Sequence, residues 1–164
     1  MERLWAPWRM KFIEQLREQG AGCVFCELAT AGDDRARLVL HRGKRCYAVL
    51  NRFPYNNGHI MVVPYRHEGE LSSLEPADYS EMLSVCSHAV RIMRERMEAE
   101  GFNIGLNIGA VAGAGITDHV HMHLVPRWRG DSNFLPVLGD TKCMPEYLEE
   151  TYARLVSDFQ KIGR

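Results

Sequence analysis

The sequence lacks the features that mark membrane, secreted and nucleic-acid-binding proteins. It contains no apolar run long enough to span a bilayer, and its first residues lack the apolar segment of a signal peptide. Its 20 Lys and Arg residues are balanced by 21 Asp and Glu residues, and the net charge of −1 creates no global basic field. We therefore expect a cytoplasmic protein that contacts no membrane and no nucleic acid, and that binds any phosphate-bearing ligand at a local site.

Cysteine is also scarce, and the five cysteines are an odd number, which argues against a disulfide framework. Repeats and low-complexity tracts are absent. The length of 164 residues fits one domain that buries a core without cross-links. We expect a single domain over residues 1–164, with a helix and a cysteine pair in residues 1–30, a core in residues 31–134 and an extension with a helix in residues 135–164.

Hydrophobic periodicity predicts an α+β fold. Apolar runs over residues 37–41, 46–50 and 59–64 predict strands, and Gly43 between the first two predicts a hairpin. The other expected elements are helices over residues 8–19, 76–100 and 145–160, a turn at residues 23–26, and strands over residues 102–108 and 117–127. Strands before and after one long helix predict a mostly antiparallel sheet with one long helix and a C-terminal helix.

The long helix begins near Pro76, and Gly101 is expected to end it. Its apolar stripe at helical spacing contains Tyr79, Met82, Leu83, Cys86, Ala89, Val90, Met93 and Met97. A methionine-rich stripe is sometimes a binding surface. Methionine is also a flexible apolar filler, and we interpret this stripe as a core face with Cys86 as a buried thiol.

His119, His121 and His123 alternate with apolar residues near the end of the chain. On a strand the three side chains share one face, with neighbours roughly 6.6 Å apart. A lone histidine on a half-exposed strand carries little meaning, but three in alternation, out of seven in the chain, favour a function. Neutral imidazole is both a nucleophile and a metal ligand.

A glycine-rich segment precedes the histidines. Gly109, Gly113 and Gly115 allow positive φ and close backbone approach, so their N–H groups can hold an anionic oxygen. A flexible hairpin loop is the competing interpretation. The position directly before the histidines favours the anion site, and together the two segments indicate attack on a phosphorus atom.

The segment at residues 119–125 resembles the His-x-His-x-His-x-x motif, with x apolar, of the histidine triad (HIT) family. The resemblance covers nearly the whole chain and implies a HIT-like fold. Residues 51–54 and 58–64 resemble the nucleoside-binding strand pair of the family, and residues 107–109 its phosphate-contacting turn. Residues 4–9 and 126–134 resemble a bacterial branch associated with diadenosine tetraphosphate phosphorylase activity.

This resemblance implies nucleotidyl transfer in two steps. His121 attacks the α-phosphorus of a nucleoside polyphosphate, and water or inorganic phosphate then removes the nucleotide from the histidine. His123 and the glycine turn, including Gly113, would stabilise the non-bridging oxygens. The other implied roles are a phosphate contact for Asn107, a ribose or base contact for Asn51, base contacts for Leu50 and Phe53, and support of the triad by His59.

One position departs from the family pattern. Many members carry a glutamine four residues before the first triad histidine, and this chain has Gly115 there. We expect the missing side chain to open space for inorganic phosphate as the acceptor.

Cys23 and Cys26 have the spacing of a zinc knuckle. A redox pair and a pair of buried thiols are the alternatives, although no thioredoxin-like pattern surrounds the two cysteines. His67 and His119 are the natural further ligands, and zinc-bearing HIT proteins have histidines at matching positions. Four protein ligands make a closed site, so the zinc ion would be structural.

Two other functions stay open beside phosphorolysis of diadenosine tetraphosphate to ADP and ATP. One is hydrolysis of dinucleoside polyphosphates or adenylylated compounds with release of AMP. The other is a zinc-stabilised nucleotide-binding protein without turnover. The resemblance also implies a homodimer or a higher homo-oligomer, and it leaves Arg127 and Asp131 open between a phosphate contact and a partner contact.

Overall fold

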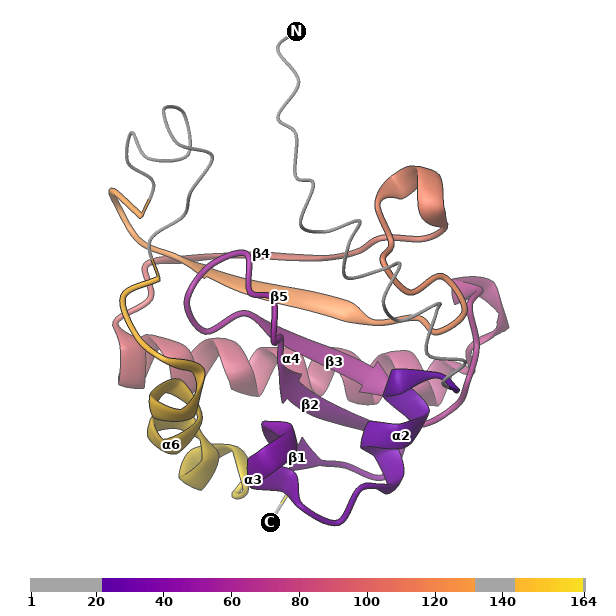
Figure 1. Cartoon of the computed structure of the whole chain (residues 1–164), viewed down its shortest axis with the longest axis horizontal. Coiled ribbons are helices and arrows are strands. Elements are labelled where there is room, and N and C mark those ends of the chain that lie inside the picture. Colours follow the sequence, from indigo (N-terminus) through magenta and orange to yellow (C-terminus); the bar gives the residue numbers. More distant parts are fainter. Residues whose placement is uncertain (1–21, 132–143, 164) are drawn as a thin grey trace, which may run out of the picture.

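A computed structural model describes residues 22–131 and 144–163 (Figure 1). The helix expected over residues 8–19 lies outside these ranges. The described elements follow in the order α2 (Val24–Thr30), α3 (Asp34–Arg37), β1 (Val39–Arg42), β2 (Cys46–Leu50), β3 (Ile60–Pro64), η1 (Leu71–Ser73), α4 (Pro76–Met97), β4 (Gly101–Leu106), η2 (Ala110–Ala112), β5 (Met122–Arg127) and α6 (Leu148–Phe159). This arrangement confirms the predicted α+β fold. None of the described helices is long and apolar enough to cross a bilayer.

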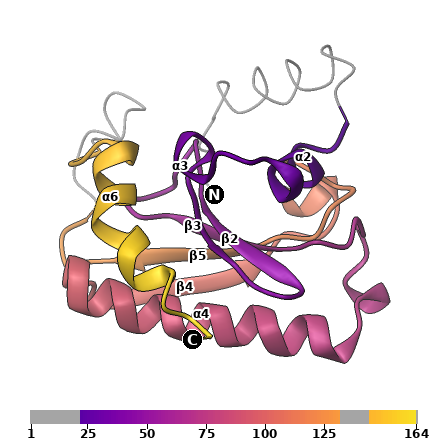
Figure 2. The ribbon, with the colours of Figure 1, turned by 90° about the horizontal axis from the view of Figure 1, so that it is seen from below.

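The five strands form one antiparallel sheet in the order β1-β2-β3-β5-β4. Figure 2 shows α4 along one face of the sheet and α2 over the opposite face. One register row crosses the sheet through His123, Met61, Val49 and Val39. Side chains paired across neighbouring strands point to the same face, so this row runs across the floor beneath α2.

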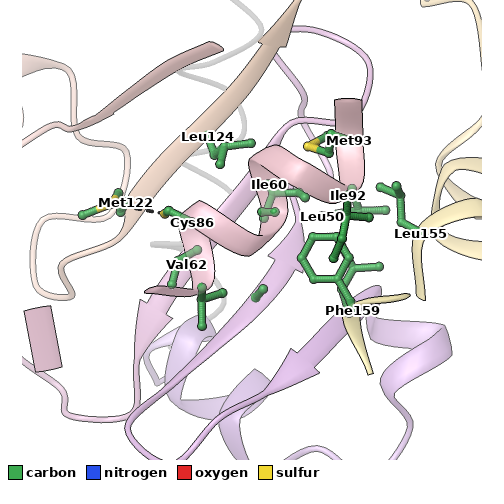
Figure 3. Close-up of a cluster of buried hydrophobic side chains, with 14 of the residues drawn as sticks. Leu50, Ile60, Val62, Cys86, Ile92, Met93, Met122, Leu124, Leu155 and Phe159 are labelled. Carbon is green, nitrogen blue, oxygen red and sulfur yellow. Dashed lines mark hydrogen bonds between the residues drawn. The ribbon is translucent and has the colours of Figure 1, made fainter. Parts of the chain in front are cut away.

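The main core lies between the sheet and α4 (Figure 3). Its buried side chains include Leu50, Ile60, Val62, Met93, Met122 and Leu124, and α6 adds Leu155 and Phe159. A smaller cluster on the other face joins Phe25 of α2 to Val39, Tyr47, Val49 and Val63 of the sheet. This second cluster holds α2 above the strands that carry the histidines.

Helix α4 starts where the sequence predicts, but it ends earlier. Pro76 opens it, and Glu75 and Asp78 form a capping box. The helix ends at Met97 because Glu98 adopts the left-handed conformation with φ of 52°, and Gly101 instead begins β4. The core face is confirmed for Met82, Cys86, Ala89, Met93 and Met97, whereas Leu83 is 57% exposed and does not belong to it.

The strand predicted over residues 37–41 starts later. Residues 34–37 form α3 with the Asp33 side chain as its N-cap, and Leu38 adopts the left-handed conformation before β1 begins. The predicted turn at residues 23–26 is also wrong, because Cys23 is the N-cap residue of α2 and Cys26 lies within that helix.

The strand predicted over residues 117–127 is shorter still. Strand β5 begins at Met122, so His119 and His121 precede it, and only His123 lies on the strand. Pairing between β3 and β5 stops at Val62 and Met122. Further along β3, Pro64 has no N–H to donate, and its carbonyl accepts a bond from the ring of His119.

Candidate active site

A cavity of about 390 Å³ lies between α2 and the sheet. Cavities of this size are typical of small-molecule sites. The predicted site residues that line it are Leu50, Asn51, Phe53, Gly115, His121 and His123. Val24, Phe25 and Leu28 of α2 form one wall, while Val49 and Met61 form an apolar floor. The structure thus joins the loop after β2 to the histidine segment around one cavity.

His121 lies at one end of this cavity with its tautomer fixed by the backbone. Its Nδ1 lies 2.9 Å from the carbonyl oxygen of His119, which can only accept a hydrogen bond. Nδ1 therefore carries the hydrogen, and Nε2 keeps its lone pair. Burial lowers the pKa of His121, so the imidazole is neutral near pH 7. The side chain is only 5% exposed and packs against the ring of Phe25, with centroids 4.8 Å apart.

His123 receives the opposite tautomer through His59. The backbone N–H of Tyr55 donates to His59 Nδ1 at 3.0 Å, so His59 carries its hydrogen on Nε2. This Nε2 lies 2.9 Å from His123 Nδ1, which therefore accepts. His123 in its neutral form then carries its hydrogen on Nε2. Neighbouring rings at the cavity thus offer a lone pair on His121 and an N–H on His123.

The loop that carries Tyr55 is anchored at its next residue. The amide of Asn56 donates to the carbonyl of Pro126 at 3.0 Å and to Asp131 at 2.8 Å. Arg127 binds Asp131 through two nitrogens, and this guanidinium lowers the pKa of Asp131 to about 2. Arg127 and Asp131, whose roles the sequence left open, therefore pair with each other and hold this loop.

His119 points away from the cavity toward a group of potential metal ligands. Its Nε2 lies 2.8 Å from the Pro64 carbonyl, so Nδ1 is unprotonated and faces the two thiols. Nδ1 lies 3.2 Å from Cys23 Sγ and 3.7 Å from Cys26 Sγ. Nδ1 of His67 lies 3.3 Å from Cys26 Sγ, and all four ligand atoms lie within 4.8 Å of one another.

This geometry fits a tetrahedral zinc ion. Zn–S bonds of about 2.3 Å and Zn–N bonds of about 2.0 Å place neighbouring ligand atoms roughly 3.3–3.8 Å apart. The carbonyl of Pro64 also orients the ring of His119, as an outer partner of a metal-bound histidine does. The structure brings together the four predicted ligands, Cys23, Cys26, His67 and His119.

The glycine turn is only partly placed at the cavity. Gly109 and Gly113 use the positive φ that glycine allows, with values of 77° and 87°, whereas Gly115 lines the cavity without a positive φ. Asn107 and Gly113 are not among the described residues that line it. Their phosphate contacts stay a prediction.

Sequence reasoning missed three contributors to the site. Phe25 lies between Cys23 and Cys26, in a segment that was interpreted only as a metal-binding turn. Tyr55 acts through its backbone N–H, which no side-chain pattern reveals. Arg37 lines the cavity from the end opposite His123. As the first residue of the strand predicted over residues 37–41, Arg37 gave no signal of this position.

Comparisons with known proteins agree with the geometry. The model of the HIT domain family matches residues 34–130. The chain is 38% identical over 168 aligned residues to an AP-4-A phosphorylase of Mycobacterium tuberculosis, covering 98% of this chain and 86% of that protein. It is 29% identical to an adenosine 5'-monophosphoramidase of Candida albicans, covering 65% of this chain and 71% of that protein.

A solved structure shares the fold. The crystal structure of a Zn-bound histidine triad family protein from Mycobacterium smegmatis superposes with a TM-score of 0.69 at 27% identity, covering 84% of this chain and 93% of that chain. That protein has the fold predicted for this chain, and it binds zinc.

Proposed function

The chain belongs to the HIT domain family, and from this membership we propose that it transfers a nucleotidyl group through a covalent intermediate on His121. The proposed substrate is diadenosine tetraphosphate, and the proposed acceptor is inorganic phosphate. The observation that carries the proposal is the pair of fixed tautomers, with a lone pair on His121 and an N–H on His123 at one end of an apolar cavity.

In the first step, the lone pair of His121 Nε2 attacks the α-phosphorus. A P–N bond forms as the bond to the bridging oxygen breaks, and ATP leaves. The N–H of His123 is placed to donate to oxygen atoms on which negative charge develops. In the second step, an oxygen of phosphate attacks the same phosphorus, the P–N bond breaks, and ADP is released. Water as the acceptor would release AMP.

The apolar part of the cavity suits the nucleoside. Val49 and Met61 provide a floor, and Leu28 covers it from α2. Asn51 lies at the end of β2, and its side chain accepts a bond from the N–H of Phe53 and lies 3.3 Å from His59 Nδ1. We propose that Asn51 contacts the ribose and that Phe53 faces the base. The base contact expected for Leu50 does not fit, because its side chain is buried in the main core on the opposite face of the sheet.

We propose that the four-ligand cluster holds a structural zinc ion. Bound zinc would supply a closed tetrahedral brace without an open coordination position. The cluster joins the N-terminus of α2 to His119, whose carbonyl fixes the tautomer of His121. Zinc would therefore hold a cavity wall and the nucleophile's support in one rigid unit.

Cytoplasmic location and a homo-oligomer stay predictions.

Similarity to the M. tuberculosis AP-4-A phosphorylase over nearly the whole chain supports phosphorolysis. Similarity to the C. albicans monophosphoramidase supports the alternative, hydrolysis of adenylylated compounds with release of AMP. The available lone pair on His121 Nε2 argues against a nucleotide-binding protein without turnover.

Product analysis tests the proposal. Incubation with diadenosine tetraphosphate and phosphate should give ADP and ATP in equal amounts, and omission of phosphate should stop ADP formation. His121→Ala supplies the background. AMP and ATP without phosphate would establish a hydrolase instead. Absence of any product that depends on His121 would contradict the proposal for this substrate.

Gly115→Gln tests the acceptor. Gly115 lines the cavity together with His121, so an added amide occupies space that phosphate would use. We expect the ratio of AMP to ADP to rise about tenfold or more at fixed phosphate, equivalent to about 1.4 kcal/mol between the two barriers. Gly115→Ala, which restricts the same backbone position without adding the amide, is the control. An unchanged product ratio in Gly115→Gln would rule out this role.

A further inference from the structure

Arg37 lies at the end of the cavity opposite the reacting histidines. The register row from His123 through Met61 and Val49 to Val39 spans three strand spacings, roughly 14 Å. Arg37 stands two residues before Val39, on the short helix α3, and lines the cavity from there. A cation therefore borders the apolar end of the site, far from where the α-phosphate would lie.

The guanidinium of Arg37 is available to a ligand. Within residues 22–131 and 144–163, no side-chain hydrogen bond or ion pair engages it. Neighbouring arginines differ: Arg42 donates to the carbonyls of Leu28, Ala29 and Ala31 at the end of α2, and Arg52 donates to the carbonyl of Ala36. Arg52 also lines the cavity and is exposed, but it is engaged by its bond to Ala36, whereas Arg37 is exposed at the edge without such a bond.

The position of His121 determines which part of a substrate would meet Arg37. With the α-phosphorus beside His121 Nε2, the nucleoside extends over Met61 and Val49, and the remaining phosphates depart on the side opposite the attacking nitrogen. The C6 end of a purine, which lies across the base from the glycosidic bond, then faces α3. This placement rests on the proposed function.

We propose that Arg37 is a specificity-determining residue that recognises guanine, so that the site accepts guanine nucleotides as well as adenine nucleotides and binds the guanine forms more tightly. A guanidinium offers only donors. Guanine presents two neighbouring acceptors, O6 and N7, which a guanidinium can bind together, whereas adenine presents N7 beside an amino donor. Val49 and Met61 of the floor have no hydrogen-bond donors for that edge.

Equilibrium binding of GMP and AMP tests this inference without depending on turnover. The wild-type protein should bind GMP at least about fivefold more tightly than AMP, the lower end of the discrimination of a bidentate arginine contact. Arg37→Met keeps an apolar stem and removes the donors, so it should weaken GMP binding about fivefold and bring the two affinities close to equal. Arg35→Met is the matched control, since Arg35 is exposed on the same helix and does not line this cavity.

Two results would overturn the role of Arg37 alone. One is a ratio of GMP to AMP affinity that is the same in wild type and Arg37→Met. The other is an equal loss of both affinities, which would indicate a general charge contact. If neither mononucleotide binds the wild-type protein, the nucleotide site itself is wrong, and both proposals fail.

Discussion

Replacing His121 with alanine is expected to lower kcat/KM for diadenosine tetraphosphate by roughly 10⁴-fold or more while changing nucleotide affinity little. The large loss follows because a removed nucleophile leaves no covalent route, and the remaining groups supply only a part of catalysis. Affinity should change by about threefold or less, because the apolar walls and Asn51 remain. Steady-state kinetics and equilibrium binding measure the two effects separately.

His121→Gly makes the same experiment sharper. This variant leaves room for free imidazole, which should restore part of the turnover if the missing group is only a nucleophile. His88→Ala, on α4 and outside the cavity lining, is the matched control and should keep full activity. Activity above about 1% in His121→Ala, or a loss of nucleotide affinity as large as the loss of kcat/KM, would contradict a nucleophilic role.

The histidine segment shows how far sequence reasoning reached. The pattern at residues 119–125 predicted correctly that Val120, Met122 and Leu124 face the core, and all three are buried. The strand itself was predicted too long. Strand pairing depends on what the neighbouring strand offers, and the end of β3 at Pro64 lies 55 residues away from His119 in the chain. Period-two alternation therefore located the side chains better than the hydrogen-bonded strand.

The different roles of the histidines could not be predicted from the sequence. His121 and His123 have opposite tautomers because one contacts a nearby carbonyl and the other contacts His59, which in turn accepts from the N–H of Tyr55. These are backbone and long-range contacts, and no spacing rule encodes them. The short helix α2 was missed for a similar reason: seven residues carry little helical signal, and its position depends on packing of Phe25 against the sheet.

The second large effect is expected from removing one ligand of the four-ligand cluster, which should change zinc content, nucleotide binding and thermal stability. Cys26→Ala is expected to lose zinc and to weaken AMP binding about tenfold or more. We attribute the weaker binding to disorder of α2 after the zinc is lost. The substitution itself does not destabilise the helix, because alanine is a better helix former than cysteine. The C-terminal half of α2 stays held by Arg42, whereas its first turn is held by the metal cluster, by the packing of Phe25 against the sheet and by the bond from Tyr47 to the Phe25 carbonyl.

The loss of metal should also lower Tm. A ligand present at a thousand times its Kd stabilises the folded state by about 4 kcal/mol, which for a chain of this size corresponds to roughly 8–16 °C. Metal analysis, calorimetry and AMP binding would follow the change, and Cys86→Ala, a buried thiol on α4, should keep the zinc. Chelator treatment of the wild type should reproduce both effects, and added zinc should reverse them there but not in Cys26→Ala. Undiminished zinc in Cys26→Ala would refute the ligand assignment, whereas zinc loss with unchanged AMP affinity would mean that the cavity wall stands without the metal.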